Sequence, residues 1–333
     1  MRRIVILALV AVLALGVLGF AQELGTKDRP IRLILVPSTN VEVVQETGEI
    51  IAQALYDLTG LWIEAYMTPD TAAAVEEVRA AEGDVFAFLS TKVYVQAYEA
   101  AGGLDFRLVS VRQGYTAYWS GFYARRDSGI ESILDLEGKK WGYAYPGSSS
   151  GYQYPNITLA KYGVTPGDSL ETGSHSNSMV AVYEGDVDFC TGYFSAPKPP
   201  LWVKQLGLQW EEHMYPELGI WDPVNNELYT GCCPWGVKDL RLAVMDTYPD
   251  ILEKVAVVGI SDSIPNDGVS FVLDFPEDLK EKIIEGLLTY IHSIEGRKVF
   301  GNPQFYEWDD IYPAGDEIYD VVRKVMGIPI PER

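Results

Sequence analysis

The chain has 333 residues, with 26 basic against 47 acidic side chains and a formal net charge of −21 at pH 7. So acidic a surface repels nucleic acid and anionic membranes, which excludes both as general partners, and a bound anion would have to be held by local donors. The length exceeds the usual size of one hydrophobic core and predicts two lobes.

The first 21 residues have the pattern of a secretory signal peptide. Arg2 and Arg3 are basic, Ile4 to Leu18 form an apolar run, and Gly19 and Ala21 are the small residues of a cleavage site. The run is short for a transmembrane helix, and no cysteine follows it to receive a lipid. We therefore expect a periplasmic or secreted protein, with an uncleaved N-terminal anchor as the alternative.

Beyond residue 30, strand-like and helix-like segments alternate. The strands are expected at 31–37, 61–67 and 84–89, and the helices at 41–58, 69–81 and 92–101. This order predicts a parallel sheet covered by helices, with ligands bound beyond the carboxyl ends of the strands. Those ends carry Ser38, Thr39, Ser90 and Thr91.

The alternation breaks near Asp127 and restarts with a strand expected at 140–145, which marks a second lobe. Residues 195–235, rich in proline, tryptophan and acidic residues, are expected to form an irregular insertion. The chain should cross between lobes near 125 and near 266. Lobe one then comprises 31–125 and 267–333, and lobe two comprises 126–266.

A glycine-bounded run of serines follows the strand expected at 140–145. It comprises Gly147, Ser148, Ser149, Ser150 and Gly151 and precedes a helical segment. A helix N-terminus offers unpaired N–H groups and the positive end of the helix dipole, hydroxyls add donors, and glycine permits close approach of a ligand. The pattern favours an oxyanion site, and the alternative is a turn that only caps the helix.

Five segments together resemble the periplasmic substrate-binding proteins of phosphate, phosphite and phosphonate-type ABC transporters. They are Asp127–Lys139, Gly147–Gly151 with Pro155, Gly173–His175, Gly185–Asp188 and Ser263–Asp267. The resemblance runs from about residue 31 to 325. It implies an α/β type II periplasmic-binding-protein fold, in which each lobe has a mixed, mostly parallel sheet flanked by helices and the cleft lies between the lobes.

The resemblance also implies the ligand contacts. Lobe two would contribute Ser148, Ser149, Ser150, Gly151 and His175. Lobe one would contribute Tyr94, beside Ser38, Thr39 and Thr91 at the strand ends. The alternatives are that His175 is a loop histidine bonded to the backbone and that Tyr94 is one of many structural tyrosines.

The implied function is a receptor, not an enzyme, that binds a phosphonate, phosphite or similar anion between its lobes. Closure about a hinge would then present the ligand to a membrane ABC permease. No cofactor, metal or nucleic-acid partner is expected, and the protein is expected to be a monomer.

Two departures from the family pattern keep other ligands open. Ser90–Thr91 stand where the family usually has Gly-Pro or Ser-Pro, and aromatic residues crowd the expected cleft. These are Tyr115, Tyr118, Trp119, Tyr145, Tyr152, Tyr154, Tyr193 and Phe194. Some could form a cage for a cationic or apolar substituent, which makes a different organic solute the main alternative.

The sequence leaves two further functions open. One is a sensory binding protein of the same fold. The other is a hydrolase that uses Ser149, His175 and Asp188, which have the residue types of a catalytic triad. The serine run is not a clear nucleophile elbow, so catalysis is disfavoured.

The three cysteines are Cys190, Cys232 and Cys233. In an oxidising compartment Cys190 could pair with either of the other two, or all three could remain thiols. Zinc is not expected, because no second set of ligands has the right spacing.

Overall fold

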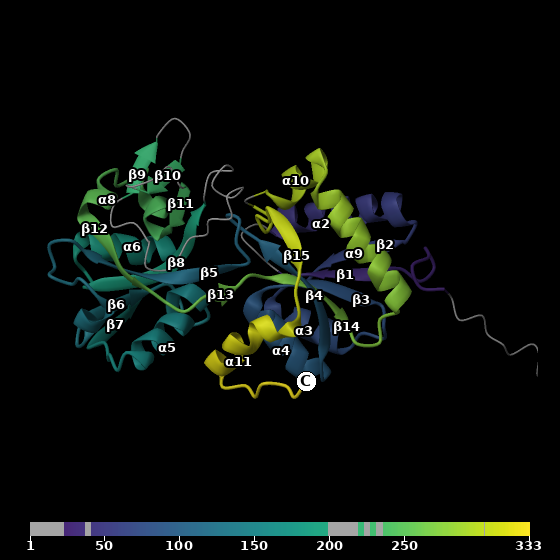
Figure 1. The fold of residues 1–333 in the computed structure, drawn as a ribbon, viewed down its shortest axis with the longest axis horizontal. Coiled ribbons are helices and arrows are strands. Elements are labelled where there is room, and N and C mark those ends of the chain that lie inside the picture. The colour runs from purple at the N-terminus through teal and green to yellow at the C-terminus, as the bar shows by residue number, and fades with distance from the viewer. Residues whose placement is uncertain (1–22, 37–40, 199–218, 223–226, 231–235, 303) are drawn as a thin grey trace, which may run out of the picture.

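Two β-sheets, each covered by helices, lie side by side and form two lobes (Figure 1). The structure is a computed structural model. It describes residues 23–36, 41–198, 219–222, 227–230, 236–302 and 304–333. The expected signal peptide, Ser38 and Thr39, and Cys232 and Cys233 lie outside the described residues.

The first sheet has six strands in the order β15-β4-β14-β3-β1-β2. These are β1 (Ile31–Leu35), β2 (Ile63–Met67), β3 (Val85–Leu89), β4 (Leu104–Val111), β14 (Gly268–Val272) and β15 (Asp310–Pro313). β1 pairs in parallel with β2 and β3, whereas the pairs that involve β14 or β15 are antiparallel. β3 is buried along its whole length, as expected of a strand covered on both faces.

Helices cover both faces of this sheet (Figure 1). One face carries α2 (Val41–Thr59), α9 (Glu277–Ile291) and α10 (Ile294–Phe300), and the other carries α3 (Thr71–Arg79), α4 (Thr91–Ala101) and α11 (Asp320–Met326). Local sequence sets their ends. Asp70 caps α3 by accepting the Ala73 N–H, and α4 ends at Gly102 in the left-handed conformation.

The second sheet has nine strands, with β12-β5-β8-β11-β10-β9 as its main path. They are β5 (Ala117–Arg125), β6 (Lys140–Tyr143), β7 (Asp168–Glu171), β8 (Phe189–Lys198), β9 (Gly219–Asp222), β10 (Glu227–Thr230), β11 (Gly236–Asp239), β12 (Val255–Ile260) and β13 (Ile264–Pro265). β6 pairs in parallel with β7 and β8, and the other pairs along the described strands are antiparallel. Both sheets are therefore mixed, as expected, but antiparallel pairing is commoner than the α/β alternation predicted.

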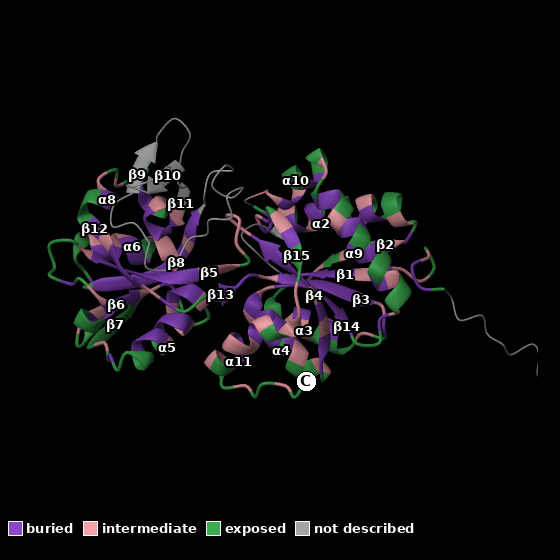
Figure 2. Ribbon diagram, viewed as in Figure 1, coloured by how far each residue is buried: buried purple, intermediate pink, exposed green. Residues whose placement is uncertain are grey.

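The second sheet also has a helix layer on each side. α5 (Tyr154–Lys161) packs on one face, and α6 (His175–Glu184) and α8 (Ile251–Lys254) pack on the other (Figure 1). Buried residues follow both sheets, and exposed residues lie on the outer helix faces (Figure 2). None of the helices in the described part of the chain has the length and apolar character needed to cross a bilayer.

The pairing of β5 shows that the chain passes from lobe one to lobe two earlier than the predicted crossing near residue 125. The predicted boundary places this strand in lobe one, but the strand pairs with β8 and β12 in the second sheet. The chain therefore leaves the first sheet after Val111, at the end of β4, and enters the second at Ala117. The return falls between Pro265 and Gly268. The apolar pattern of β5 marks a strand, but only its distant partners decide which sheet it joins.

The segment 195–235 is not wholly irregular. β8 continues to Lys198, and β9 and β10 form an antiparallel pair within it. Just before it, Cys190 is a buried free thiol on β8.

Candidate functional site

A cavity of about 710 Å³ lies between the lobes. Residues from both lobes and from the connection near Asp267 line it. They are Thr71, Ala72, Val75, Glu76, Ser90, Thr91, Lys92, Val93, Gln96, Tyr118, Tyr145, Gly147, Ser148, Ser149, Ser150, His175 and Asp267. The cavity thus collects the first residues of α3, α4 and α6 and the predicted serine loop.

The serine loop opens a π-helical turn, Ser149–Gln153, that runs into α5. Ser148 caps this turn, because its Oγ accepts the Gly151 N–H at 3.0 Å. The amides of Ser149 and Ser150 come first in the turn and have no partner within it. Two hydroxyls of the sheet hold the loop from behind: Ser120 donates to the Ser150 carbonyl, and Thr191 donates to the Gly151 carbonyl. Because the carbonyls bond to the sheet, the loop is left with donors for the cavity.

His175 is the first residue of α6, whose cap Ser174 accepts the Asn177 N–H. Its Nε2 lies 3.3 Å from Ser148 Oγ, and the ring packs between Tyr145 and Tyr193. Burial lowers the pKa of His175, so the imidazole is neutral at pH 7. Nδ1 is buried without a partner among the described residues. Nε2 is therefore the ring nitrogen available to a ligand.

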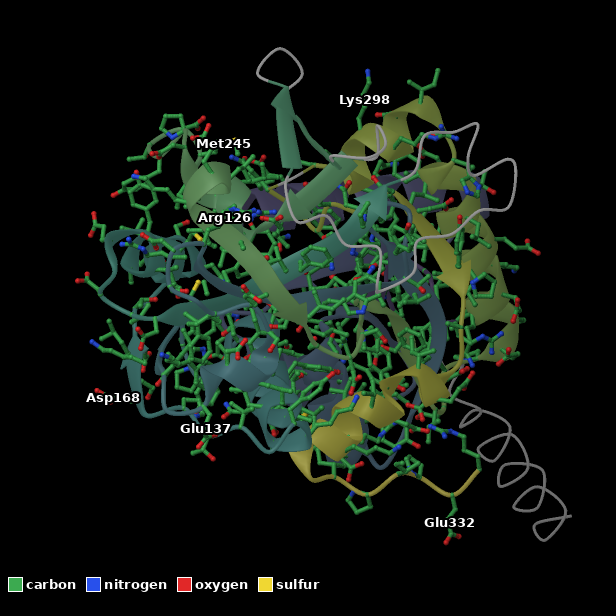
Figure 3. The ribbon with its side chains drawn as sticks, turned by 60° about the vertical axis from the view of Figure 1, so that its left-hand side comes forward. Arg126, Glu137, Asp168, Met245, Lys298 and Glu332 are labelled. Atoms are coloured by element: carbon green, nitrogen blue, oxygen red, sulfur yellow. The ribbon has the colours of Figure 1, made fainter. Side chains whose placement is uncertain are left out.

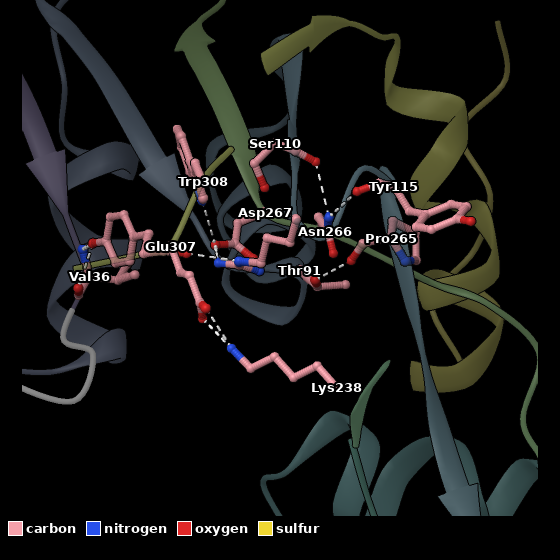
Figure 4. A network of polar contacts seen from close by, with 12 residues as sticks. Val36, Thr91, Ser110, Tyr115, Lys238, Pro265, Asn266, Asp267, Glu307 and Trp308 are labelled. Atoms are coloured by element: carbon pink, nitrogen blue, oxygen red, sulfur yellow. Dashed lines mark hydrogen bonds and ion pairs between the residues drawn. The ribbon is translucent and has the colours of Figure 1, made fainter. Parts of the chain in front are cut away.

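Lobe one presents the start of α4. Ser90 occupies the cap position, but its side chain makes no cap hydrogen bond. The N–H groups of the first turn, at Thr91, Lys92 and Val93, have no intrahelical acceptors. Thr91 Oγ1 donates to the Pro265 carbonyl at 2.7 Å and ties this turn to β13 (Figure 4). The dipoles of α4 and α6 and of the turn before α5 thus place partial positive charge around one cavity.

The lining also includes two carboxylates, and both already have partners. Arg112 forms a two-pronged ion pair with Asp267, and the Trp308 indole donates to the same carboxylate at 3.3 Å (Figure 4). Glu76 pairs with Arg79 at the surface. Acidic side chains elsewhere, such as Glu137, Asp168 and Glu332, point outward (Figure 3). An anion in the cavity would therefore meet backbone and hydroxyl donors, together with the Lys92 side chain, rather than unpaired negative charge.

Tyr118 adds a hydroxyl at the boundary between the lobes. Burial, with the nearby Asp267 carboxylate, raises the pKa of Tyr118 to about 12. The group stays protonated at neutral pH and can donate a hydrogen bond into the cavity.

Comparison with known proteins supplies the family. A family model described as "ABC transporter, phosphonate, periplasmic substrate-binding protein" matches residues 33–314. The chain belongs to this family. This membership confirms the resemblance inferred from the serine loop, the Gly-Ser-His segment and the other motifs.

Two curated relatives and a solved structure extend the comparison. The chain is 28% identical to the phosphate-import protein PhnD of Mycolicibacterium smegmatis over 173 residues, 47% of this chain and 53% of that protein. It is 26% identical to the phosphonates-binding periplasmic protein of Escherichia coli over 172 residues, 47% of this chain and 50% of that protein. The chain therefore spans about half the length of the curated relatives it matches.

The solved structure is PhnD1 from Prochlorococcus marinus in complex with methylphosphonate. It matches with a TM-score of 0.54 and 14% sequence identity, covering 89% of this chain and 96% of that one. This likeness confirms the expected type II periplasmic-binding-protein fold.

Most of the residues that the family resemblance implied lie together. Ser148, Ser149, Ser150 and His175 line the cavity from lobe two, and Thr91 lines it from lobe one. Gly151 is not among the lining residues, and its N–H donates to Ser148 Oγ.

Tyr94 does not line the cavity. Its side chain is buried against Phe106 and Tyr319, and its hydroxyl donates to Asp316 at 2.6 Å. The reason lies in helix geometry: the start of α4 faces the cavity, but Tyr94, at the end of the first turn, points into the core.

The alternative triad is not assembled. The serine beside His175 is Ser148, not Ser149, and the Asp188 carboxylate accepts the Lys140 N–H at 2.8 Å. Among the residues that the structure describes, none places a carboxylate on His175 Nδ1 to orient the ring as a base.

The sequence reasoning missed the contribution of α3 and of Lys92. A signal for α3 was present, since Asp70 and Thr71 mark a helix N-terminus directly after β2. The same rule that identified Ser90 and Thr91 at the end of β3 would have placed Thr71 and Ala72 at the site.

Proposed function

We propose that this protein binds a small phosphorus oxyanion, namely a phosphonate, phosphite or phosphate, in the cavity between its lobes. One observation supports this above the others: helix N-termini from both lobes, with serine hydroxyls and a neutral histidine, surround one cavity. Such donors recognise an oxyanion through hydrogen bonds and helix dipoles, and the Lys92 side chain in the same lining adds a cation. The membership of the phosphonate-binding family agrees with this chemistry.

A ligand that contacts the serine loop and α4 together favours the arrangement with the lobes closed on it. We propose that the closed form acts outside the cytoplasm as a monomer and delivers the ligand to an ABC permease.

The test is isothermal titration calorimetry of the protein lacking residues 1–21 with methylphosphonate, phosphite, phosphate and sulfate. Binding of at least one phosphorus oxyanion is expected, weakened by about tenfold or more in Ser148→Ala and His175→Ala, since each removes a hydrogen bond to a charged group. His292→Ala is the matched control, because His292 is exposed and pairs with Asp310 away from the cavity.

Unchanged affinity in both folded site variants would overturn the site. Absence of binding to any of these anions would overturn the ligand class and favour a different organic solute beside Tyr118 and Tyr145.

A further inference from the structure

Two adjacent residues of β8 contact the two ligand-binding elements of lobe two from opposite faces of the sheet. β8 lies inside this sheet, where it pairs with β5, β6 and β11. Successive side chains of a strand point to opposite faces. Phe189 accordingly lies in the core beneath α5 with Leu159, and Cys190 lies in the core beneath α6 with Met179.

Thr191 faces the serine loop and is fully buried. Its Oγ1 accepts the indole N–H of Trp141 at 2.9 Å and donates to the Gly151 carbonyl at 2.6 Å. An indole nitrogen only donates and a carbonyl only accepts, so the direction of both bonds is fixed. Thr191 thus holds the end of the loop at a defined place on the sheet.

Gly192 faces His175. A Cβ at this position would lie 3.0 Å from His175 Nδ1 and 2.5 Å from Leu240 Cδ2. Gly151 flanks the ring as well, since a Cβ there would lie 3.0 Å from His175 Cε1. The His175 imidazole therefore packs between Gly151 and Gly192, where the absence of side chains leaves room for the ring. This packing accounts for the unpartnered Nδ1, and it leaves Nε2 beside Ser148.

We propose that Thr191 and Gly192 are positioning residues for the anion site: Thr191 fixes the serine loop and Gly192 fixes the His175 ring. Neither residue lines the cavity, so both act through the groups that do. The inference rests on the proposed function, because it assigns these residues to the binding of the same anion. Two adjacent residues of β8 would then hold both the serine loop and the His175 ring in place.

Thr191 is tested by substitution and conservative rescue. Thr191→Val keeps the shape but removes both hydrogen bonds, and we expect methylphosphonate affinity to fall about tenfold. Thr191→Ser keeps the hydroxyl and should restore affinity to within about threefold of wild type. The matched control is Thr158→Val on α5, because the buried Thr158 hydroxyl donates to the Tyr154 carbonyl away from the cavity. This control should lose stability without losing affinity.

Gly192 is tested in two backgrounds, because an added methyl group would also meet Leu240. In the Leu240→Ala background the conflict with His175 remains, so Gly192→Ala should still weaken methylphosphonate binding about tenfold. The effect should vanish when His175→Ala is also present. Gly142→Ala is the control: its Cβ would lie 3.0 Å from Val187 Cγ2, a similar crowding at another buried strand position.

A spectroscopic measurement separates positioning from general damage. In the ligand-free protein, Gly192→Ala should shift the imidazole ¹⁵N resonances of His175, and Gly142→Ala should leave them in place. Thr191→Val and Gly192→Ala/Leu240→Ala proteins that bind as tightly as their parents would overturn the proposal, as would an unshifted His175 signal. If wild type binds no phosphorus oxyanion, the proposed function fails, but the resonances still decide whether Gly192 positions the ring.

Discussion

Ser148 Oγ lies 3.3 Å from His175 Nε2, so the cap of the turn before α5 and the first residue of α6 meet at one edge of the cavity. The contact joins two helix N-termini whose chain positions are 27 residues apart. Each N-terminus alone would be an ordinary capped helix. Together they form a surface of donors on lobe two, opposite the start of α4 on lobe one.

Burial of His175 predicts a specific dependence of stability on pH. Its pKa lies below the ordinary value of 6.5 in the folded protein, so the unfolded chain takes up the proton first as pH falls. The stability due to the neutral imidazole is present above pH 6.5 and is lost as pH falls below it. Urea unfolding at pH 7.5 and 5.5 should show a larger loss of stability in wild type than in His175→Gln. Equal losses would contradict the neutral, buried state.

Tyr94→Phe distinguishes a core tyrosine from a ligand contact. The Tyr94 hydroxyl donates to Asp316, which also pairs with Arg323 and Arg333. Removing the hydroxyl should lower the free energy of unfolding by about 1–2 kcal/mol, because a bond to a charged acceptor is lost. Methylphosphonate affinity, measured by calorimetry, should stay within about twofold of wild type. A large loss of affinity with unchanged stability would restore the role that the family resemblance implied.

Tyr94 also shows where sequence reasoning reached its limit. The serine loop and the end of β3 could be predicted, because strand ends and helix caps are local patterns, whereas His175 was implied by the family resemblance. The direction of Tyr94 is not local, since its partner Asp316 lies 222 residues away. The same applies to β5, whose apolar sequence fits either sheet until its pairing with β8 and β12 is known. Local patterns thus placed the serine loop and the strand ends, the resemblance added His175 and Tyr94, and long-range packing decided which of these residues reach the cavity.

The ion pair between Lys238 and Glu307 joins the two lobes near Asp267 (Figure 4). Lys238 lies on β11, and Glu307 stands between Tyr306, which bonds the Val36 backbone, and Trp308, which bonds Asp267. Lys238→Glu should let the lobes separate more and weaken methylphosphonate binding by about threefold, as expected for a half-exposed pair. The reversed pair, Lys238→Glu with Glu307→Lys, should recover most of the affinity. Failure of the reversed pair to do so would show that the contact does not set lobe spacing.

Replacing Ser90 by alanine is expected to weaken ligand binding without lowering the stability of the fold. Its side chain lines the cavity and makes no hydrogen bond to α4, so Ser90→Ala should change the free energy of unfolding by less than about 0.5 kcal/mol. Losing a hydroxyl donor to the anion should nevertheless weaken methylphosphonate binding about fivefold to tenfold. Ser293→Ala is the opposite case, because Ser293 caps α10 through the Gly296 N–H and does not line the cavity. It should cost about 1 kcal/mol of stability and leave affinity unchanged. Calorimetry and urea unfolding of both variants give the comparison, and a Ser90→Ala protein that loses stability but binds normally would make Ser90 an ordinary cap.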